Sequence, residues 1–177
     1  IRDVLGSRGL GDVYKRQMSA AVASAFAGDW DLCVFDVGGD AAGAMSLGRY
    51  HTDFAALEDG QLEVYDIVNV FRPMSESPEK IIKLKEEMEG FARLKVTGFV
   101  NNSNLLNFAS ADDIRQGYDV LRETSDMTGI PVAHTTGRKC FLEEFLRDGR
   151  DPKYIGEPIG LETYMHRSWE AFTNLGL

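Results

Sequence analysis

Hydrophobic residues along this chain fall alternately into short unbroken runs and into segments with a helical period. The unbroken runs are rich in Val, Ile and Phe, and they predict strands at residues 32–36, 62–71, 94–100 and 130–134. The periodic segments predict helices at residues 18–27, 41–54, 77–92, 110–128 and 139–147. Strands joined by helical crossovers run in the same direction, so the pattern predicts an α/β fold whose mainly parallel sheet is flanked by helices.

Two of the predicted helices have well-defined starts. Ser77 precedes Pro78 as a cap, and Ser110 with Asp113 has the spacing of a capping box, while Gly129 ends the second helix. Along the first of them, four apolar residues recur at helical spacing and predict the buried face: Ile81, Leu84, Met88 and Phe91. The intervening charged residues predict a solvated outer face: Lys83, Lys85, Glu86, Glu87 and Glu89.

The stretch Leu32–Asp40 (LCVFDVGGD) is the most informative of the chain. Its apolar run does not alternate, which is typical of a strand buried on both faces of a parallel sheet, and Cys33 is expected there as a small core residue. Asp36 ends this strand, where open α/β sheets bind ligands, and two glycines then allow a sharp turn before Asp40. The alternative is purely structural: a buried strand, a Gly turn and an Asp helix cap.

Composition narrows the class of protein. The 177 residues carry a net charge of −9, which argues against a broad nucleic-acid interface. No apolar run reaches the roughly 18 residues that a membrane span requires, and no secretory signal is evident, so a cytoplasmic location is expected. The two cysteines form no C-x-x-C motif, and the three histidines share no metal-ligand spacing.

The first 17 residues (IRDVLGSRGLGDVYKRQ) have no clear helix or strand period. They resemble a translated vector or adaptor scar, so we expect the native domain to lie within residues 18–177. The stretch contains a G-x-x-x-x-G frame from Gly6 to Gly11. However, Asp12 stands where a phosphate-binding loop needs lysine, so this frame is interpreted as non-functional.

Several segments, taken in order, carry a family resemblance: VFDVGGD, LGRY, VNVFRP, SPEKI, RLKVTGFVNNSNL and IPV. Together they resemble the carboxyl-terminal two-thirds of the CobQ/CobB/MinD/ParA family of P-loop nucleotide-binding ATPases. The resemblance extends from about Trp30 to Trp169. It implies a cytosolic protein that binds ATP and Mg²⁺.

The resemblance also implies roles for individual residues. Asp36 matches the family's acid that orders Mg²⁺, usually through a water, and it is the first candidate for a catalytic residue, with Asp40 the second. Gly38 and Gly39 would form the turn near the γ-phosphate. Asn101 matches the asparagine that contacts the nucleotide base, with Asn102 as the fallback, since an amide offers both donors and acceptors. Without the resemblance, these asparagines are typical of a polar strand-to-helix loop.

The family's glycine-rich phosphate loop and first strand are missing, and no Gly-Lys pair occurs anywhere in the chain. We therefore expect a partial P-loop domain. In the family the missing strand lies between the Asp36 strand and the next strand of the chain. Its loss predicts that residues 32–36 are weakly paired or close the gap against residues 62–70.

Three functions are compatible with these observations. The first is the carboxyl-terminal fragment of an ATPase that is inactive without the missing loop. The second is a nucleotide-dependent switch or scaffold with little turnover, acting through a homodimer or a protein partner. The third is a non-catalytic α/β interaction domain in which the Asp-Gly-Gly turn is only structural.

Overall fold

The computed structural model describes residues 24–162, which fall into two units divided between Gly38 and Gly39. In the first unit, residues 24–27 are helical and the following residues, through 38, form no strand. Leu32 and Val34 are each 80% exposed, and Cys33 is also exposed. The predicted buried strand at 32–36 and the predicted core position of Cys33 are therefore wrong. An apolar strand needs a paired neighbour to be buried, and among the described residues none pairs with this segment. The expectation of weak pairing fits this outcome.

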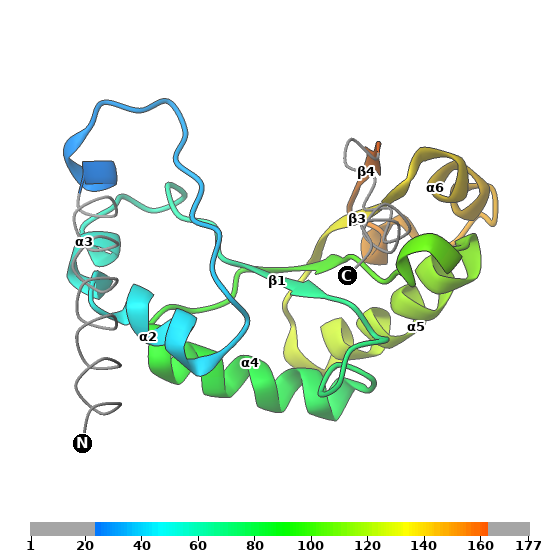
Figure 1. The fold of residues 1–177 in the computed structure, drawn as a ribbon, viewed down its shortest axis with the longest axis horizontal. Coiled ribbons are helices and arrows are strands. Elements are labelled where there is room, and N and C mark those ends of the chain that lie inside the picture. The colour runs from blue at the N-terminus through cyan, green and yellow to red at the C-terminus, as the bar shows by residue number, and fades with distance from the viewer. Residues whose placement is uncertain (1–23, 163–177) are drawn as a thin grey trace, which may run out of the picture. The chain divides into compact units, whose positions relative to one another are not determined.

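The second unit is built on a four-stranded parallel sheet in the order β1-β2-β3-β4 (Figure 1). The strands are β1 (Tyr65–Val68), β2 (Gly98–Asn101), β3 (Val132–Arg138) and β4 (Glu157–Leu161). This confirms an α/β fold with a parallel sheet and flanking helices. The first three strands fall within or beside predicted runs, whereas β4 was not predicted.

The helices of this unit include three that connect the strands: α4 (Pro78–Ala92), α5 (Ala111–Thr128) and α6 (Lys139–Leu146). The shorter helices are α2 (Ala41–Gly48), α3 (His51–Ala55), η1 (Leu106–Phe108) and η2 (Pro152–Tyr154). The predicted helix at 41–54 is thus split in two, between Gly48 and His51. The capping box of Ser110 and Asp113 is confirmed, and Gly129 ends α5 in the left-handed conformation with φ of 74°.

All three connecting helices pack against one face of the sheet. A strand order that always advances in the same direction produces this arrangement, because crossovers between parallel strands are right-handed. Two clusters of buried apolar side chains fill this first face. One joins β1, β2 and β3 to α4 and α5: Val68, Val70, Ile81, Phe99, Leu121 and Val132. The other joins α5 to α6 and η2: Ile114, Tyr118, Leu142, Phe145 and Ile155.

The buried stripe of α4 differs from the predicted one. Ile81 is buried as predicted, but Phe91 is 37% exposed, and the charged residues Lys85 and Glu89 are buried. They pair with each other at 3.3 Å between Nζ and Oε1. Glu89 also accepts hydrogen bonds from the backbone of Val96 (3.0 Å) and from Lys95 (2.7 Å). The predicted solvation of Lys85 and Glu89 is therefore wrong, because these partners satisfy the charges inside the structure.

Asp66 of β1 lies near this ion pair. Burial raises the pKa of its carboxyl group to about 6; the charge of Lys85 lowers it, and that of Glu89 raises it further. An acid whose pKa is higher in the folded state stabilises the fold at low pH, and it loses that contribution as pH rises through the folded value. The ionised carboxylate of Asp66 consequently lowers the free energy of unfolding at neutral pH.

We predict that Asp66→Asn raises the free energy of unfolding at pH 7 by about 1–3 kcal/mol, because the neutral amide has no buried charge to desolvate. The gain should shrink as pH falls through about 6 and should be small near pH 3, where the wild-type carboxyl is mostly protonated in both states. Urea unfolding at about pH 3 and pH 7 measures both values. Asp59→Asn, in an exposed turn, is the matched control. An equal effect of Asp66→Asn at the two pH values would contradict the assignment.

Candidate functional site

Polar side chains gather at the carboxyl ends of β1 and β2. The two segments that follow these strands lie side by side. Asn69 donates from Nδ2 to the carbonyl oxygen of Asn104 (3.0 Å), and Ser103 accepts from the backbone N–H of Val70 (3.3 Å). The backbone N–H of Asn102 donates to the carbonyl of Val68 (2.8 Å). This edge is where open α/β sheets place their ligands, so it is the candidate site.

Asn101 is 1% exposed, and its amide is engaged inside the protein. Its Nδ2 donates to the carbonyl of Ile114 in α5 (3.1 Å), and its Oδ1 accepts from the backbone N–H of Ser103 (3.2 Å). Gly117 makes room for this arrangement, because a Cβ there would overlap Asn101 Oδ1 and Ser103 Oγ. Asn101 thus fixes the segment after β2 against α5, and its predicted contact with a nucleotide base stays a prediction.

Asn102 is the more accessible of the two asparagines. It is partly exposed, and its Oδ1 accepts a hydrogen bond from Oγ1 of Thr136 in β3 (2.8 Å). Among the described residues, the Nδ2 of Asn102 donates no hydrogen bond, whereas Asn101 uses both its Oδ1 and one N–H of its Nδ2. Among the described residues, Asn102 is therefore the better placed to meet a bound molecule. Sequence analysis missed Asn69 and Thr136, because each belongs to a different strand end and no local motif links them.

The segment after β2 is held in a fixed shape. Asp113 accepts from the backbone N–H groups of Leu105 (3.1 Å) and Ser110 (3.2 Å), and Asn104 Oδ1 accepts from that of Leu106 (3.2 Å). Leu106 has a φ of 57°, a conformation that costs free energy for a branched residue. The result is a loop that presents Leu106, 70% exposed, and Phe108, 87% exposed.

The other predicted residues lie around the division between the two units. Asp36 is exposed in the first unit, as is Gly38, whereas Gly39 and Asp40 begin the second. Asp40 is the N-cap of α2, and its Oδ1 accepts from the backbone N–H of Gly43 (2.7 Å). This matches the structural alternative for that carboxylate. Asp36 and the asparagines therefore belong to separate units.

Two cations stand at the carboxyl ends of the strands in the second unit. Arg72 is exposed and follows β1; its backbone N–H donates to the carbonyl of Asn69 (2.9 Å). Arg138 is exposed at the last position of β3, directly before α6. Guanidinium groups bind phosphate oxygens well, so these two side chains are the candidates in this unit for contact with an anion.

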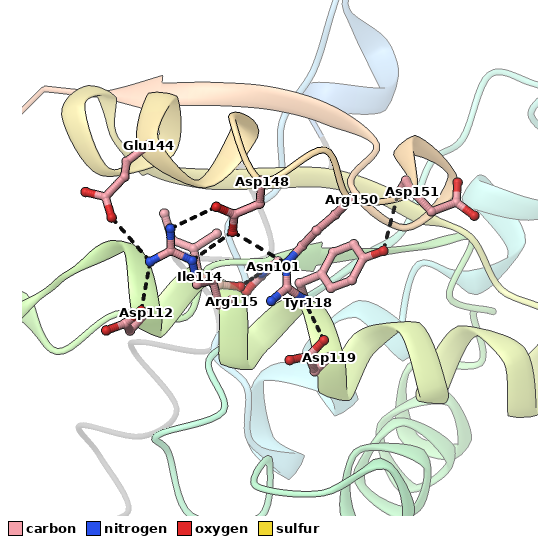
Figure 2. A network of polar contacts seen from close by, with 10 residues as sticks. All are labelled: Asn101, Asp112, Ile114, Arg115, Tyr118, Asp119, Glu144, Asp148, Arg150 and Asp151. Atoms are coloured by element: carbon pink, nitrogen blue, oxygen red, sulfur yellow. Dashed lines mark hydrogen bonds and ion pairs between the residues drawn. The ribbon is translucent and has the colours of Figure 1, made fainter.

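A network of charges holds α5 against the segment that follows α6 (Figure 2). Arg115 donates from Nε to Asp148 (2.8 Å), and it also contacts Asp112 (2.8 Å) and Glu144 (3.2 Å). Next to it, Arg150 pairs with Asp119 (2.6 Å) and stacks over the Tyr118 ring at 4.8 Å. The Arg115 hydrogen bond holds the pKa of Asp148 below its ordinary value of 3.8. This network holds α5 in place. The backbone carbonyl of Ile114 in this helix accepts the hydrogen bond from Asn101 Nδ2.

We predict that Gly117→Ala lowers the free energy of unfolding by about 1–3 kcal/mol, because the new methyl group overlaps Asn101 and Ser103. Gly90→Ala is the control: Gly90 also lies in a helix, and a Cβ there meets nothing within 4 Å. That variant should gain about 0.5–1 kcal/mol from helix propensity. Urea unfolding of the two variants gives the comparison. Equal effects would contradict the tight packing of Asn101.

We predict that Asp148→Asn lowers the Tm at pH 7, because the carboxylate no longer binds Arg115. A group whose folded pKa is depressed stabilises at higher pH and loses that contribution as pH falls through the folded value. The difference in Tm from wild type should therefore shrink below about pH 4. Glu143→Gln, an exposed residue of α6, is the control. A difference that persists unchanged at pH 3 would contradict the role of the Asp148 charge.

The described residues contain other features that bear on function. A hollow lined by Arg122, Glu123, Asp126 and Met127 lies on the carboxyl-terminal half of α5, at the opposite end of that helix from the asparagines. Within residues 24–162, no three metal-ligating side chains gather into a group that could hold an ion. No helix of that part is long and apolar enough to cross a membrane.

The fold and the site define an α/β protein with a polar carboxyl edge. No family model, curated protein or solved structure matches the chain.

Proposed function

We propose that this chain is the carboxyl-terminal part of a P-loop domain of the MinD/ParA type that binds and hydrolyses Mg-ATP, and that it is inactive without the phosphate loop. The observation that carries the proposal is the strand order. Among the described strands, β1 comes first in the sequence and also stands at one side of the sheet, and each later strand is added on the other side. This is the arrangement of one half of a doubly wound sheet, counted outward from its centre.

In doubly wound sheets the ligand lies at the point where the strand order reverses, beyond the carboxyl ends of the strands. If the sheet continues past β1, that point is the outer side of β1. The free edge of β1 supports such a continuation, because within the described residues β1 pairs only with β2. The resemblance places the missing phosphate-loop strand at this same edge.

The chemistry of the described residues suits part of a nucleotide site. Asn102 and Thr136 offer amide and hydroxyl groups for a base or ribose, and Arg72 offers a cation for phosphate oxygens. For Asp36, an exposed residue of the first unit, the resemblance alone implies a role, which is to order Mg²⁺ through a water. When bound, Mg-ATP would supply the γ-phosphoryl group that is transferred to water. The chain lacks a Gly-Lys loop to cradle the phosphates, so the full domain must supply it.

A second candidate function is an interaction domain without turnover. The exposed loop with Leu106 and Phe108 favours it, because this loop exposes two large apolar side chains two residues apart, and Phe is enriched at protein interfaces. The nucleotide-dependent switch combines both candidates, since a bound nucleotide at the strand ends would lie near this loop.

The test of the proposal uses the reading frame extended upstream of Met18. We predict that its product hydrolyses ATP with Mg²⁺ and that Asp36→Ala lowers kcat at saturating Mg-ATP by about 100-fold or more, because a group that positions the metal acts on the transition state. Asp59→Ala should leave kcat unchanged.

Calorimetry separates the alternatives. Mg-ATP binding without turnover in the extended protein would favour the switch. If the extended protein does not bind Mg-ATP at all, the ATPase proposal is wrong and the interaction domain is the remaining candidate.

A further inference from the structure

One buried nitrogen of the sheet has no hydrogen-bond partner among the described residues. It is Nδ1 of His134 in β3, a residue whose side chain is 21% exposed. Buried polar atoms nearly always have a partner, so this nitrogen needs an explanation. The side chains that surround the imidazole ring provide one.

These side chains come from the strands on either side of β3. From β4, the carboxylate of Glu157 places its Oε2 3.7 Å from His134 Nδ1. From β1, the ring of Tyr65 stands edge-to-face with the imidazole at 5.3 Å between centroids, and its hydroxyl donates to Glu63 (2.6 Å). Val100 is the register partner on β2 and carries no charge. The charged groups that face the ring from these strands are therefore carboxylates.

His134 is the member of this group that changes charge near neutral pH. The hydrogen bond to Glu63, burial, and the charges of Glu63 and Glu157 raise the pKa of Tyr65 above its ordinary value of 10.0, so this phenol stays neutral. An imidazole, in contrast, takes up a proton between about pH 8 and pH 5. Arg138, the cation at the end of β3, lies four residues further along the strand, about 13 Å away.

Protonation would supply the missing partner of Nδ1. The separation of 3.7 Å is too long for a hydrogen bond but is within reach of an ion pair. A protonated ring donates from both nitrogens and carries a charge opposite to that of Glu157. The Glu157 side chain is 77% exposed, so it can rotate towards the ring without displacing packed neighbours.

We propose that His134 and Glu157 form a pH-dependent ion pair that holds β4 against β3. At the acid end of the imidazole range, Nδ1 donates to the carboxylate of Glu157, and the pair joins two residues that are already register partners. At the alkaline end the ring is neutral and this link between the strands is lost. The proposal is independent of the proposed ATPase function.

β4 is the strand of the described sheet that depends most on such a link. It stands at the edge, pairs only with β3 among the described strands, and has all five of its residues exposed. The residue before its turn is attached by Thr135, whose Oγ1 donates to the carbonyl of Ile155 (2.7 Å). Elements with few buried contacts open locally at a low cost in free energy. The charge of His134 would therefore set how often β4 separates from the sheet.

Hydrogen exchange of the full chain tests the proposal at about pH 5.5 and about pH 7.5, with each rate divided by its intrinsic rate. The β4 amides are compared with that of Phe99 in the interior strand β2, which donates to the carbonyl of Pro131 (2.9 Å). This reference is needed because Asp66 also stabilises the whole fold at lower pH. We expect the ratio of β4 protection to Phe99 protection to be about two- to five-fold higher at the lower pH.

Two substitutions remove the ion pair from either side. Glu157→Gln keeps an exposed side chain of the same size without the charge, and it should make the ratio independent of pH; His134→Gln should do the same. Glu143→Gln in α6 and His51→Gln in α3 are the matched controls, and both should retain the pH effect because they lie outside β3 and β4. A wild-type ratio that does not change with pH, or a change that persists in Glu157→Gln, would overturn the proposal.

Discussion

The direction in which the strands are added is the constraint on which the rest of this structure depends. Crossovers between parallel strands are as a rule right-handed, and the strands of this sheet advance in one order, so the connecting helices lie on one face. Among the described residues, the same order leaves β1 and β4 as the two edges of the sheet, and the connecting helices do not cover the face that carries Ile67 and Ile159. The proposed function follows from the edge at β1, because a free edge there points to further strands.

The candidate site shows how structural and binding roles divide between adjacent residues. Asn101 and Asn102 are neighbours in the chain, yet alternation along the strand end sends their side chains to different places. Asn101 is enclosed by α5, where Gly117 gives it space and Ile114 accepts its N–H. Asn102 reaches Thr136 on the next strand and remains partly exposed. The buried amide of Asn101, with its hydrogen bonds satisfied, holds the loop in place. The partly exposed amide of Asn102 is left available to contact a ligand.

The sequence predicted the class of fold and most helices, because capping residues and helical spacing act locally. Ser110, Asp113 and Gly129 are examples in which the local signal decided the outcome. Sequence analysis failed where residues distant in the chain determine whether a segment is buried. The periodicity of α4 could not show that Lys85 and Glu89 are buried, because Val96 and Lys95 satisfy Glu89 from a later turn of the chain. The apolar run at 32–36 predicted a buried strand, but burial requires a neighbouring strand.

The candidate site was predictable only in part. The polar run after β2 was visible as consecutive asparagines, whereas Asn69 and Thr136 come to it from separate strands. β4 escaped prediction because Pro158 and Gly160, which are uncommon inside strands, interrupt its few apolar residues. In each case the missing information was the order of the strands in space.

The central claim is that β1 is an interior strand whose outer neighbour is missing. Hydrogen exchange of the backbone amides of β1 tests this claim most directly. Asp66 and Val68 point their backbone groups to β2, and Tyr65 and Ile67 therefore point theirs to the open side. In this chain the amides of Tyr65 and Ile67 should exchange much faster than those of Asp66 and Val68. In the protein extended upstream of Met18, all four should exchange slowly. Fast exchange of Tyr65 and Ile67 in that extended protein would contradict the account.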